Sequence, residues 1–123
     1  MLKIVMLLRK RADLTREQFI DYYDNHHVHF MHEMLGTGAA VHRRNFVVPG
    51  TASPPDARDC DVICELFYED AATAAKTMQA LQDPEIRRRM QADEDRFIER
   101  GSIRRFVVEV HETVFRPLPQ RGA

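Results

Sequence analysis

Several features that would indicate a specialised class of protein are missing from this chain. Its 123 residues contain two cysteines, five glycines and no tryptophan, and the net charge is −1. Two cysteines are too few for a disulfide scaffold, and a balanced charge gives no basic face for nucleic acid or an anionic membrane. No apolar run approaches the roughly 20 residues of a membrane-spanning helix, and the N-terminal run lacks a signal-peptide cleavage site. We therefore expect a cytoplasmic protein with reduced thiols and with neither nucleic acid nor membrane as a partner.

Motifs for several kinds of chemistry are missing too. The sequence has no Gly-rich phosphate loop, no nucleophile elbow, no Cys-x-x-Cys pair and no His-Glu-x-x-His zinc motif. The length suits a single domain, which we place at residues 1–115, followed by a C-terminal tail at 116–123.

The pattern that remains predicts alternating strands and helices. Four strands are expected, at residues 2–9, 40–48, 61–68 and 103–115. A first helix begins at Thr15, which has capping-box spacing to Gln18. A second helical region begins at Asp70 and restarts at Asp83-Pro84, with an aspartate cap and a proline in the first turn. The order β-α-β-β-α-β predicts an α+β, ferredoxin-like plait, in which a four-stranded antiparallel sheet carries both helices on one face.

The first predicted strand is apolar on both of its faces. Leu2, Ile4, Met6 and Leu8 alternate with Val5 and Leu7. A strand of this kind is covered on both sides, whereas the predicted helices cover only one. We therefore expect a homodimer in which a second sheet covers the other face, so that the fold is a dimeric α/β barrel.

The histidines are concentrated in the first predicted helix, where four of the six lie between residues 26 and 32. Three- and four-residue spacing predicts one amphipathic stripe that includes His26. An inward imidazole with an ordinary pKa near 6.5 can act as acid or base at neutral pH. We therefore predict His26 as the catalytic group of an apolar cavity. The residues expected to contact a substrate are Phe19, Tyr22, Tyr23, His27 and Phe30.

Two other interpretations of these histidines stay open. An inward histidine can be a core residue held by one hydrogen bond to the backbone or to a tyrosine. His26, His29 and His32 are also spaced so that two ligands of a metal could share a helix face, but a third ligand with motif spacing is missing. We predict no metal and no cofactor.

Glu65 is the polar exception in the apolar third strand. A carboxylate in a covered strand must be hydrogen-bonded, paired or protonated. It can orient His26 or bind a polar group of the substrate, and it can equally pair with an arginine of the last strand. We assign Glu65 as the second catalytic group. The charge runs at residues 87–89 and 93–96 are interpreted as a solvated helix face.

Motifs along most of the chain resemble the EthD domain family. The opening resembles it in Arg9-Lys10, Thr15-x-x-x-Phe19 and Tyr22-Tyr23-Asp24-Asn25-His26-His27, and the second half in residues 61–68, Asp83-Pro84-Glu85 and Asp93-Glu94-x-x-Phe97. The resemblance implies the ferredoxin-like dimeric barrel, and the family's histidine corresponds to His26. Val28-His29 departs from the family, in which a proline commonly follows the histidine.

The resemblance also implies a class of function. EthD-like proteins include one associated with ether degradation and relatives that act as decarboxylases, dehydratases or cyclases on aromatic polyketides. The resemblance therefore implies chemistry without a cofactor, and a substrate that is a small aromatic or enolisable compound, either polyketide-like or xenobiotic. Three hypotheses follow: a lyase, cyclase or isomerase with His26 as acid/base, a cofactor-free monooxygenase, and a non-catalytic small-molecule-binding or accessory protein of a degradation pathway.

Overall fold

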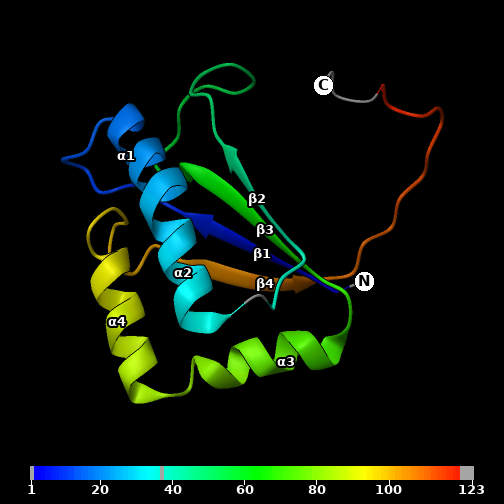
Figure 1. Ribbon diagram of the computed structural model, residues 1–123. Coiled ribbons are helices and arrows are strands. Elements are labelled where there is room, and N and C mark those ends of the chain that lie inside the picture. Colours follow the sequence, from blue (N-terminus) through cyan, green and yellow to red (C-terminus); the bar gives the residue numbers. More distant parts are fainter. Residues whose placement is uncertain (1, 37, 120–123) are drawn as a thin grey trace.

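The computed structural model, which describes residues 2–36 and 38–119, contains one four-stranded antiparallel sheet (Figure 1). The strands are β1 (Leu2–Leu8), β2 (Val41–Phe46), β3 (Val62–Tyr68) and β4 (Arg104–Val108). Their order across the sheet is β2-β3-β1-β4, so that β1 and β3 are the central pair. The predicted α+β class and ferredoxin-like order of elements are confirmed.

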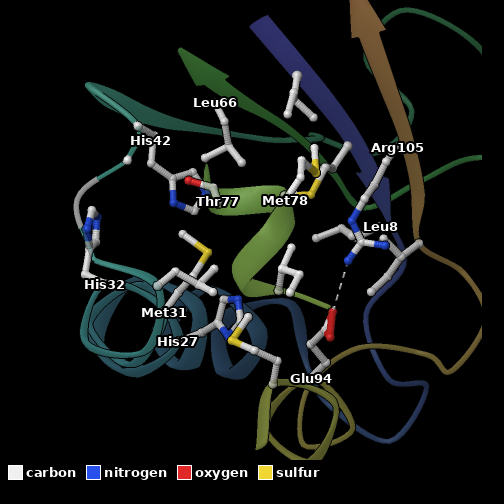
Figure 2. Close-up of a pocket in the computed structure, with 18 of the residues that line it drawn as sticks. Leu8, His27, Met31, His32, His42, Leu66, Thr77, Met78, Glu94 and Arg105 are labelled. Atoms are coloured by element: carbon white, nitrogen blue, oxygen red, sulfur yellow. Dashed lines mark ion pairs between the residues drawn. The ribbon is translucent and has the colours of Figure 1, made fainter. Parts of the chain in front are cut away.

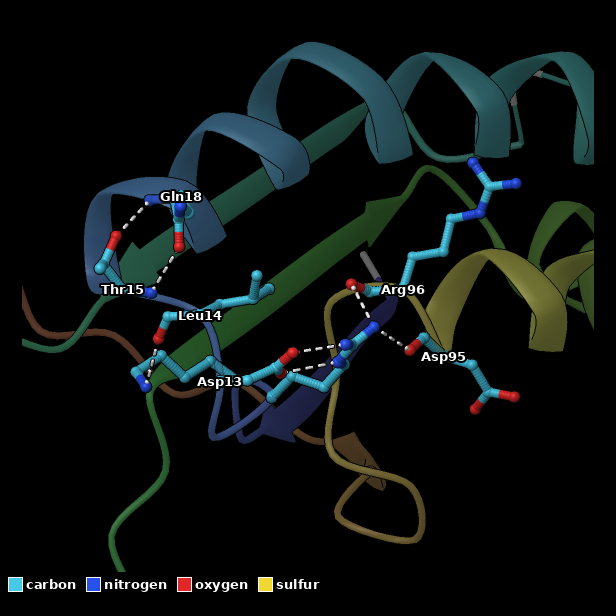
Figure 3. Close-up of polar contacts among 8 residues, drawn as sticks. Asp13, Leu14, Thr15, Gln18, Asp95 and Arg96 are labelled. Carbon is cyan, nitrogen blue, oxygen red and sulfur yellow. Dashed lines mark hydrogen bonds and ion pairs between the residues drawn. The ribbon is translucent and has the colours of Figure 1, made fainter.

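The first helical region has three parts. These are α1 (Arg16–Tyr22), a π-helical turn η1 (Tyr23–His27) and α2 (Val28–Leu35). The region begins as predicted: the Thr15 hydroxyl accepts from the Gln18 amide at 3.1 Å, and the Gln18 side chain accepts from the Thr15 amide at 2.9 Å (Figure 3). It ends at Gly36, whose φ of 73° is open to glycine at little cost.

The second helical region is broken at the predicted proline. Its parts are α3 (Ala71–Ala80) and α4 (Pro84–Glu94). The Asp70 carboxylate accepts from the Thr73 amide at 2.7 Å, and the Asp83 carboxylate accepts from the Glu85 amide at 2.9 Å. In Figure 1, α1 and α2 follow one another along one axis over the sheet, α4 lies beside them, and α3 runs across near the lower ends of α2 and α4.

The helices cover the face of the sheet formed by even-numbered residues of β1 and β3. Ile4 and Leu8 of β1 are buried there, beside the buried residues Val62, Cys64, Leu66 and Tyr68 of β3. The odd-numbered residues of β1, β2 and β3, together with the even-numbered residues of β4 that pair opposite them, form the other surface, which we name the open face. Its members include Lys3, Val5, Leu7, Arg43, Asn45, Ile63, Glu65, Phe67 and Phe106. Since Val5 pairs with both Glu65 and Phe106, charged and apolar residues share this face.

The last strand is shorter than the strand predicted at residues 103–115. β4 ends at Val108, which pairs with Lys3 near the start of β1. Beyond that pair Leu2 of β1 remains, but residues 109–119 leave the sheet (orange to red in Figure 1). This segment exposes Val110, Val114, Phe115 and Leu118.

Arg11 joins the loop after β1 to the end of α4. Its guanidinium donates to the backbone carbonyls of Asp95 and Arg96, each at 3.3 Å, and pairs with Asp13 at 2.6 Å (Figure 3). Because this loop leads directly into α1, the contact holds the first helical region beside α4. The side chains of η1 and α4 are thereby brought together.

Two further predictions concern the thiols and the membrane. Cys60 and Cys64 are both free, as the sequence predicts. Among the helices formed by residues 2–36 and 38–119, none has the length and apolar character needed to cross a membrane.

Candidate active site

A cavity lies between the helices and the covered face of the sheet (Figure 2). Its volume, taken as the space open to the centre of a water molecule, is about 90 Å³. One water needs roughly 10–15 Å³ on this measure, so there is room for a small organic molecule. Most of the wall is apolar, with Leu8, Leu66, Met31 and Met78 among its side chains. The polar side chains at the wall include His27, His32, His42, Thr77, Glu94 and Arg105.

His27 is the histidine that the π turn η1 directs into the cavity. It is 5% exposed, and its Nδ1 lies 2.6 Å from Oδ2 of Asp93 on α4. Asp93 is equally buried, and the Tyr22 hydroxyl donates to its Oδ1 at 2.5 Å. Burial acts to raise the pKa of Asp93, but the hydrogen bonds from His27 and Tyr22 outweigh it and hold that pKa below its ordinary value. Asp93 is therefore an ionised carboxylate at neutral pH.

The carboxylate fixes the roles of the two ring nitrogens of His27. An ionised Asp93 can only accept a hydrogen bond, so Nδ1 of a neutral His27 carries the hydrogen. Nε2 then keeps a lone pair, which is the form of imidazole that accepts a proton. The arrangement is suited to taking a proton from a molecule in the cavity and returning it.

His26, predicted to be the inward catalytic group, lies on the outer side of the same turn. Its side chain is 51% exposed, and its Nε2 lies 3.4 Å from Oδ1 of Asp93. The predicted inward orientation is wrong, because a π turn places one extra residue in the helical repeat. The buried positions therefore follow a spacing of four, from Phe19 through Tyr23 to His27.

The residues predicted to contact a substrate are divided among cavity, core and surface. Tyr23 and His27 line the cavity. Phe19 is 1% exposed and belongs to the core behind it. Tyr22 and Phe30 contact α4 instead. The hydroxyl of Tyr22 donates a hydrogen bond to a carboxylate of α4, and the ring of Phe30 lies beneath an arginine of α4. Their roles toward a substrate stay predictions.

Glu65 lies on the open face, on the other side of the sheet from His27. Its carboxylate pairs with Lys3, accepts from Nδ2 of Asn45 at 2.9 Å and lies 3.8 Å from Arg43. The hydrogen bond from Lys3 is the main cause that lowers the pKa of Glu65, and burial opposes it. The predicted contact of Glu65 with the catalytic histidine is not formed, because odd-numbered residues of β3 point away from the helices.

Asp93 was assigned from the sequence to a solvated helix face, and this is wrong for that residue. Met90, Asp93 and Phe97 follow one another at three- and four-residue spacing, and all three are buried. The apolar neighbours at this spacing were the signal that Asp93 points inward. The sequence could not indicate that the partner of Asp93 would be a histidine 66 positions earlier.

His42 is a second cavity histidine that the sequence analysis missed. Its place in β2 puts it on the covered face, and both ring nitrogens are buried without a hydrogen-bond partner among residues 2–36 and 38–119. Burial lowers the pKa of His42 to about 4, and the nearby side chains of Arg44, His27 and His32 act in the same direction. The two-residue alternation of β2 was the available signal, since Phe46 at an even position marks the inward side.

Glu94 and Arg105 form the polar group at the other end of the cavity (Figure 2). Nη2 of Arg105 lies 3.7 Å from Oε2 of Glu94, a loose ion pair. Burial raises the pKa of Glu94, and Arg105 opposes the rise. The cavity therefore has histidines at one end and a mutually compensated ion pair at the other.

A metal site was the alternative interpretation of the clustered histidines. In the described ranges no three side chains of His, Cys, Asp or Glu converge on a position that could hold a metal ion. His29 is exposed on α2, whereas His32 lines the cavity. The absence of a cofactor stays a prediction.

Comparisons with known proteins bear on the family and on the fold. The family model of the EthD domain matches residues 11–101. An EthD family protein from Bacillus halodurans C-125 has a similar structure, with a TM-score of 0.61 and 18% identity over 90% of this chain and 99% of that chain. An EthD-like protein from Ralstonia eutropha JMP134 gives a TM-score of 0.61 and 19% identity over 94% and 95% of the two chains. Comparison with curated proteins gives no significant match.

Proposed function

The chain belongs to the EthD domain family, and on this premise we propose that it is a cofactor-independent lyase, cyclase or isomerase acting on a small aromatic or enolisable compound. His27 is the group that transfers the proton. The observation that carries the proposal is the 2.6 Å contact between His27 and a buried, ionised Asp93 at the wall of an apolar cavity.

The chemistry follows from the orientation of the imidazole. Nε2 of His27 accepts a proton from an acidic hydroxyl or from a carbon next to a carbonyl group, and the ring becomes an imidazolium. Asp93 stabilises that cation through Nδ1, as a carboxylate does in other histidine-based sites. The same ring then returns the proton to another atom of the substrate, which completes an isomerisation, a cyclisation or an elimination.

His26 remains a rival assignment for the proton-transfer group. It contacts the other oxygen of the same carboxylate, and its ring packs on Tyr22 with centroids 4.7 Å apart. Because half of its side chain is exposed, its proton exchanges with solvent more readily than with a molecule in the cavity. The two neighbouring histidines therefore form a matched pair for mutation.

The test uses 2-tetralone, a bicyclic ketone whose C1 hydrogens exchange by enolisation. In D₂O at pH 7, the wild-type protein is expected to accelerate the exchange of these hydrogens, followed by proton NMR. His27→Gln keeps the size and hydrogen bonding of the side chain but loses the titrating group, and should reduce the protein-dependent rate by about 10²–10⁴-fold. His26→Gln, the control, should keep most of the rate.

Other outcomes of this experiment are equally informative. A folded His27→Gln variant with the wild-type rate would make His27 a structural residue, and loss of rate in His26→Gln alone would return the role to His26. No acceleration by the wild-type protein would contradict an enolising enzyme. Oxygen consumption in the same reaction would identify the cofactor-free monooxygenase.

A non-catalytic small-molecule-binding or accessory protein is the second candidate. The observation that favours it is that the His27–Asp93 contact also joins η1 to α4 and so contributes to the fold. In that case 2-tetralone would bind in the cavity without proton exchange. Measuring its dissociation constant beside its exchange rate separates the two candidates.

The partner that we propose is a second copy of this chain, docked on the open face. This face carries apolar side chains between its charges, and Ile63 and Phe106 are 37% and 42% exposed. Stable homodimers commonly bury large apolar surfaces of this kind. Sedimentation should give a dimer at micromolar concentration, and a stable monomer at that concentration would remove the proposal.

A further inference from the structure

We propose that His42 recognises the ligand of this cavity, which we infer to be a ring compound with a phenolic or enolic hydroxyl group. The hydroxyl binds to the imidazole of His42, while another part of the ring lies near Nε2 of His27. The inference rests on the proposed function, because it assumes that the cavity is the binding site.

The first support is the missing partner of His42. Its Nδ1 and Nε2 are both buried, and neither has a hydrogen-bond partner in the described part of the chain. Buried polar groups are satisfied in the great majority of cases, and an exception calls for an explanation such as a functional role. A hydroxyl group in the cavity would supply the missing bond.

The second support is the charge state of this end of the cavity. Burial and the neighbouring basic groups hold the pKa of His42 at about 4, so the ring is neutral at pH 7 and offers one donor and one acceptor. Arg44, whose charge acts on His42, already donates to Asp24 at 2.7 Å. This end therefore favours a neutral hydroxyl, which is also both donor and acceptor, over a carboxylate or a phosphate.

The third support is the relation between His42 and His27, two of the histidines that line the cavity. His42 from β2 and His27 from η1 both pack edge-on to the ring of Tyr23, with centroid distances of 6.0 and 5.3 Å. Figure 2 shows His42 beside the sheet and His27 on the helical side, with Met31 between them in this view and Leu66 next to His42. Apolar side chains and a methionine sulfur suit a flat aromatic ring. A hydroxyl at His42 would thus orient the ring toward the base.

The test compares 2-naphthol with naphthalene, which lacks the hydroxyl group. The wild-type protein should bind 2-naphthol about tenfold more tightly, the effect of one well-formed hydrogen bond. His42→Phe should abolish this preference and leave the affinity for naphthalene nearly unchanged. His29→Phe is the matched control, because His29 is exposed on α2 outside the cavity, and it should keep the preference.

The outcomes distinguish this inference from the proposed function. Equal affinities in the wild-type protein, or an unchanged preference in His42→Phe, would overturn the role of His42 while the exchange of 2-tetralone still reports on His27. If neither compound binds, or if binding leaves the ring resonances of His27 and His42 unchanged, the inference and the cavity site fail together.

A measurement on the wild-type protein covers the case in which His42→Phe does not fold. The ¹⁵N resonances of the His42 ring should shift when 2-naphthol binds and should shift much less with naphthalene. Identical shifts with the two compounds would overturn the proposal.

Discussion

The two faces of the sheet carry their polar groups in different ways. On the covered face, His27 is held by Asp93 and His42 has no partner in the described part of the chain, and both border a cavity. On the open face, Glu65 is held by Lys3 and by its neighbours Arg43 and Asn45, among exposed apolar side chains. Polar groups of the covered face thus remain available to a small molecule, whereas those of the open face satisfy one another.

This difference suggests separate roles for the two surfaces. A satisfied charge cluster surrounded by apolar residues can be covered by another protein surface without leaving a buried charge unpaired. An unsatisfied imidazole beside a cavity is instead suited to a ligand. Chemistry on one face and assembly on the other are therefore the expectations that the following experiments test.

The largest expected effect is on the free energy of unfolding, and it is measured by comparing a phenylalanine-to-alanine substitution in the core with one on the open face. Phe19→Ala removes a side chain from the core, and should lower the free energy of unfolding by about 3–5 kcal/mol. Phe106→Ala changes a residue that is 42% exposed in one chain, and its own loss should be below about 1 kcal/mol at concentrations where the protein is monomeric. Urea unfolding measures both, and equal losses would contradict the assignment of Phe106 to an uncovered surface.

The second effect concerns association through the open face. Ile63→Asp places a charge among the apolar residues of this face, and should weaken dimerisation by about 100-fold, or about 2.7 kcal/mol. Val48→Asp is the control, because Val48 is exposed beyond the end of β2. Sedimentation equilibrium measures both variants. An unchanged dimer in Ile63→Asp would mean that association uses another surface.

The third effect is a dependence of stability on pH that arises from His42. Its pKa is about 4 in the folded protein and near 6.5 in an unfolded chain. Between these values the unfolded chain binds the proton more strongly, so stability falls as the pH is lowered. The contribution of His42 is a loss of about 2 kcal/mol between pH 7 and pH 5. Urea unfolding at both pH values should show this loss in the wild-type protein and not in His42→Phe, and the same loss in both proteins would assign it elsewhere.

The smallest effect is expected at Glu65. Glu65→Gln removes the carboxylate from the cluster with Lys3 and Arg43, and partly exposed pairs of this kind contribute about 1 kcal/mol or less. The free energy of unfolding should therefore change little, and the exchange rate of 2-tetralone should not change. A large loss of that rate would restore the sequence-based assignment of Glu65 as a catalytic group.

Local signals in the sequence were sufficient for most of the fold. The capping box at Thr15, the break at Pro84 and the apolar strand before Glu69 act over a few residues, and each is present as predicted. The end of β4 was not predictable in this way, because it depends on how far β4 stays paired along β1. Strand pairing is a long-range property that the composition of residues 109–115 does not show.

For the candidate site, the sequence indicated the correct turn of helix but not the residue of that turn that points inward. A regular repeat of 3.6 residues places His26 inward, and one π turn moves the inward position to His27. No residue type in Tyr23–His27 distinguishes a π turn from an α turn. Asp93 and His42 lie far from this turn in sequence, so their contribution depends on tertiary structure.

The most direct test of the His27–Asp93 arrangement is the tautomer of His27, read from the ¹⁵N resonances and ¹⁵N–¹H couplings of its ring at pH 8. We expect a hydrogen on Nδ1, bound to Asp93, and a lone pair on Nε2 directed at the cavity. Asp93→Asn should disturb this preference, because an amide can donate to Nδ1 as well as accept. A hydrogen on Nε2 and a lone pair on Nδ1 in the wild-type protein would contradict the role of His27 as the base.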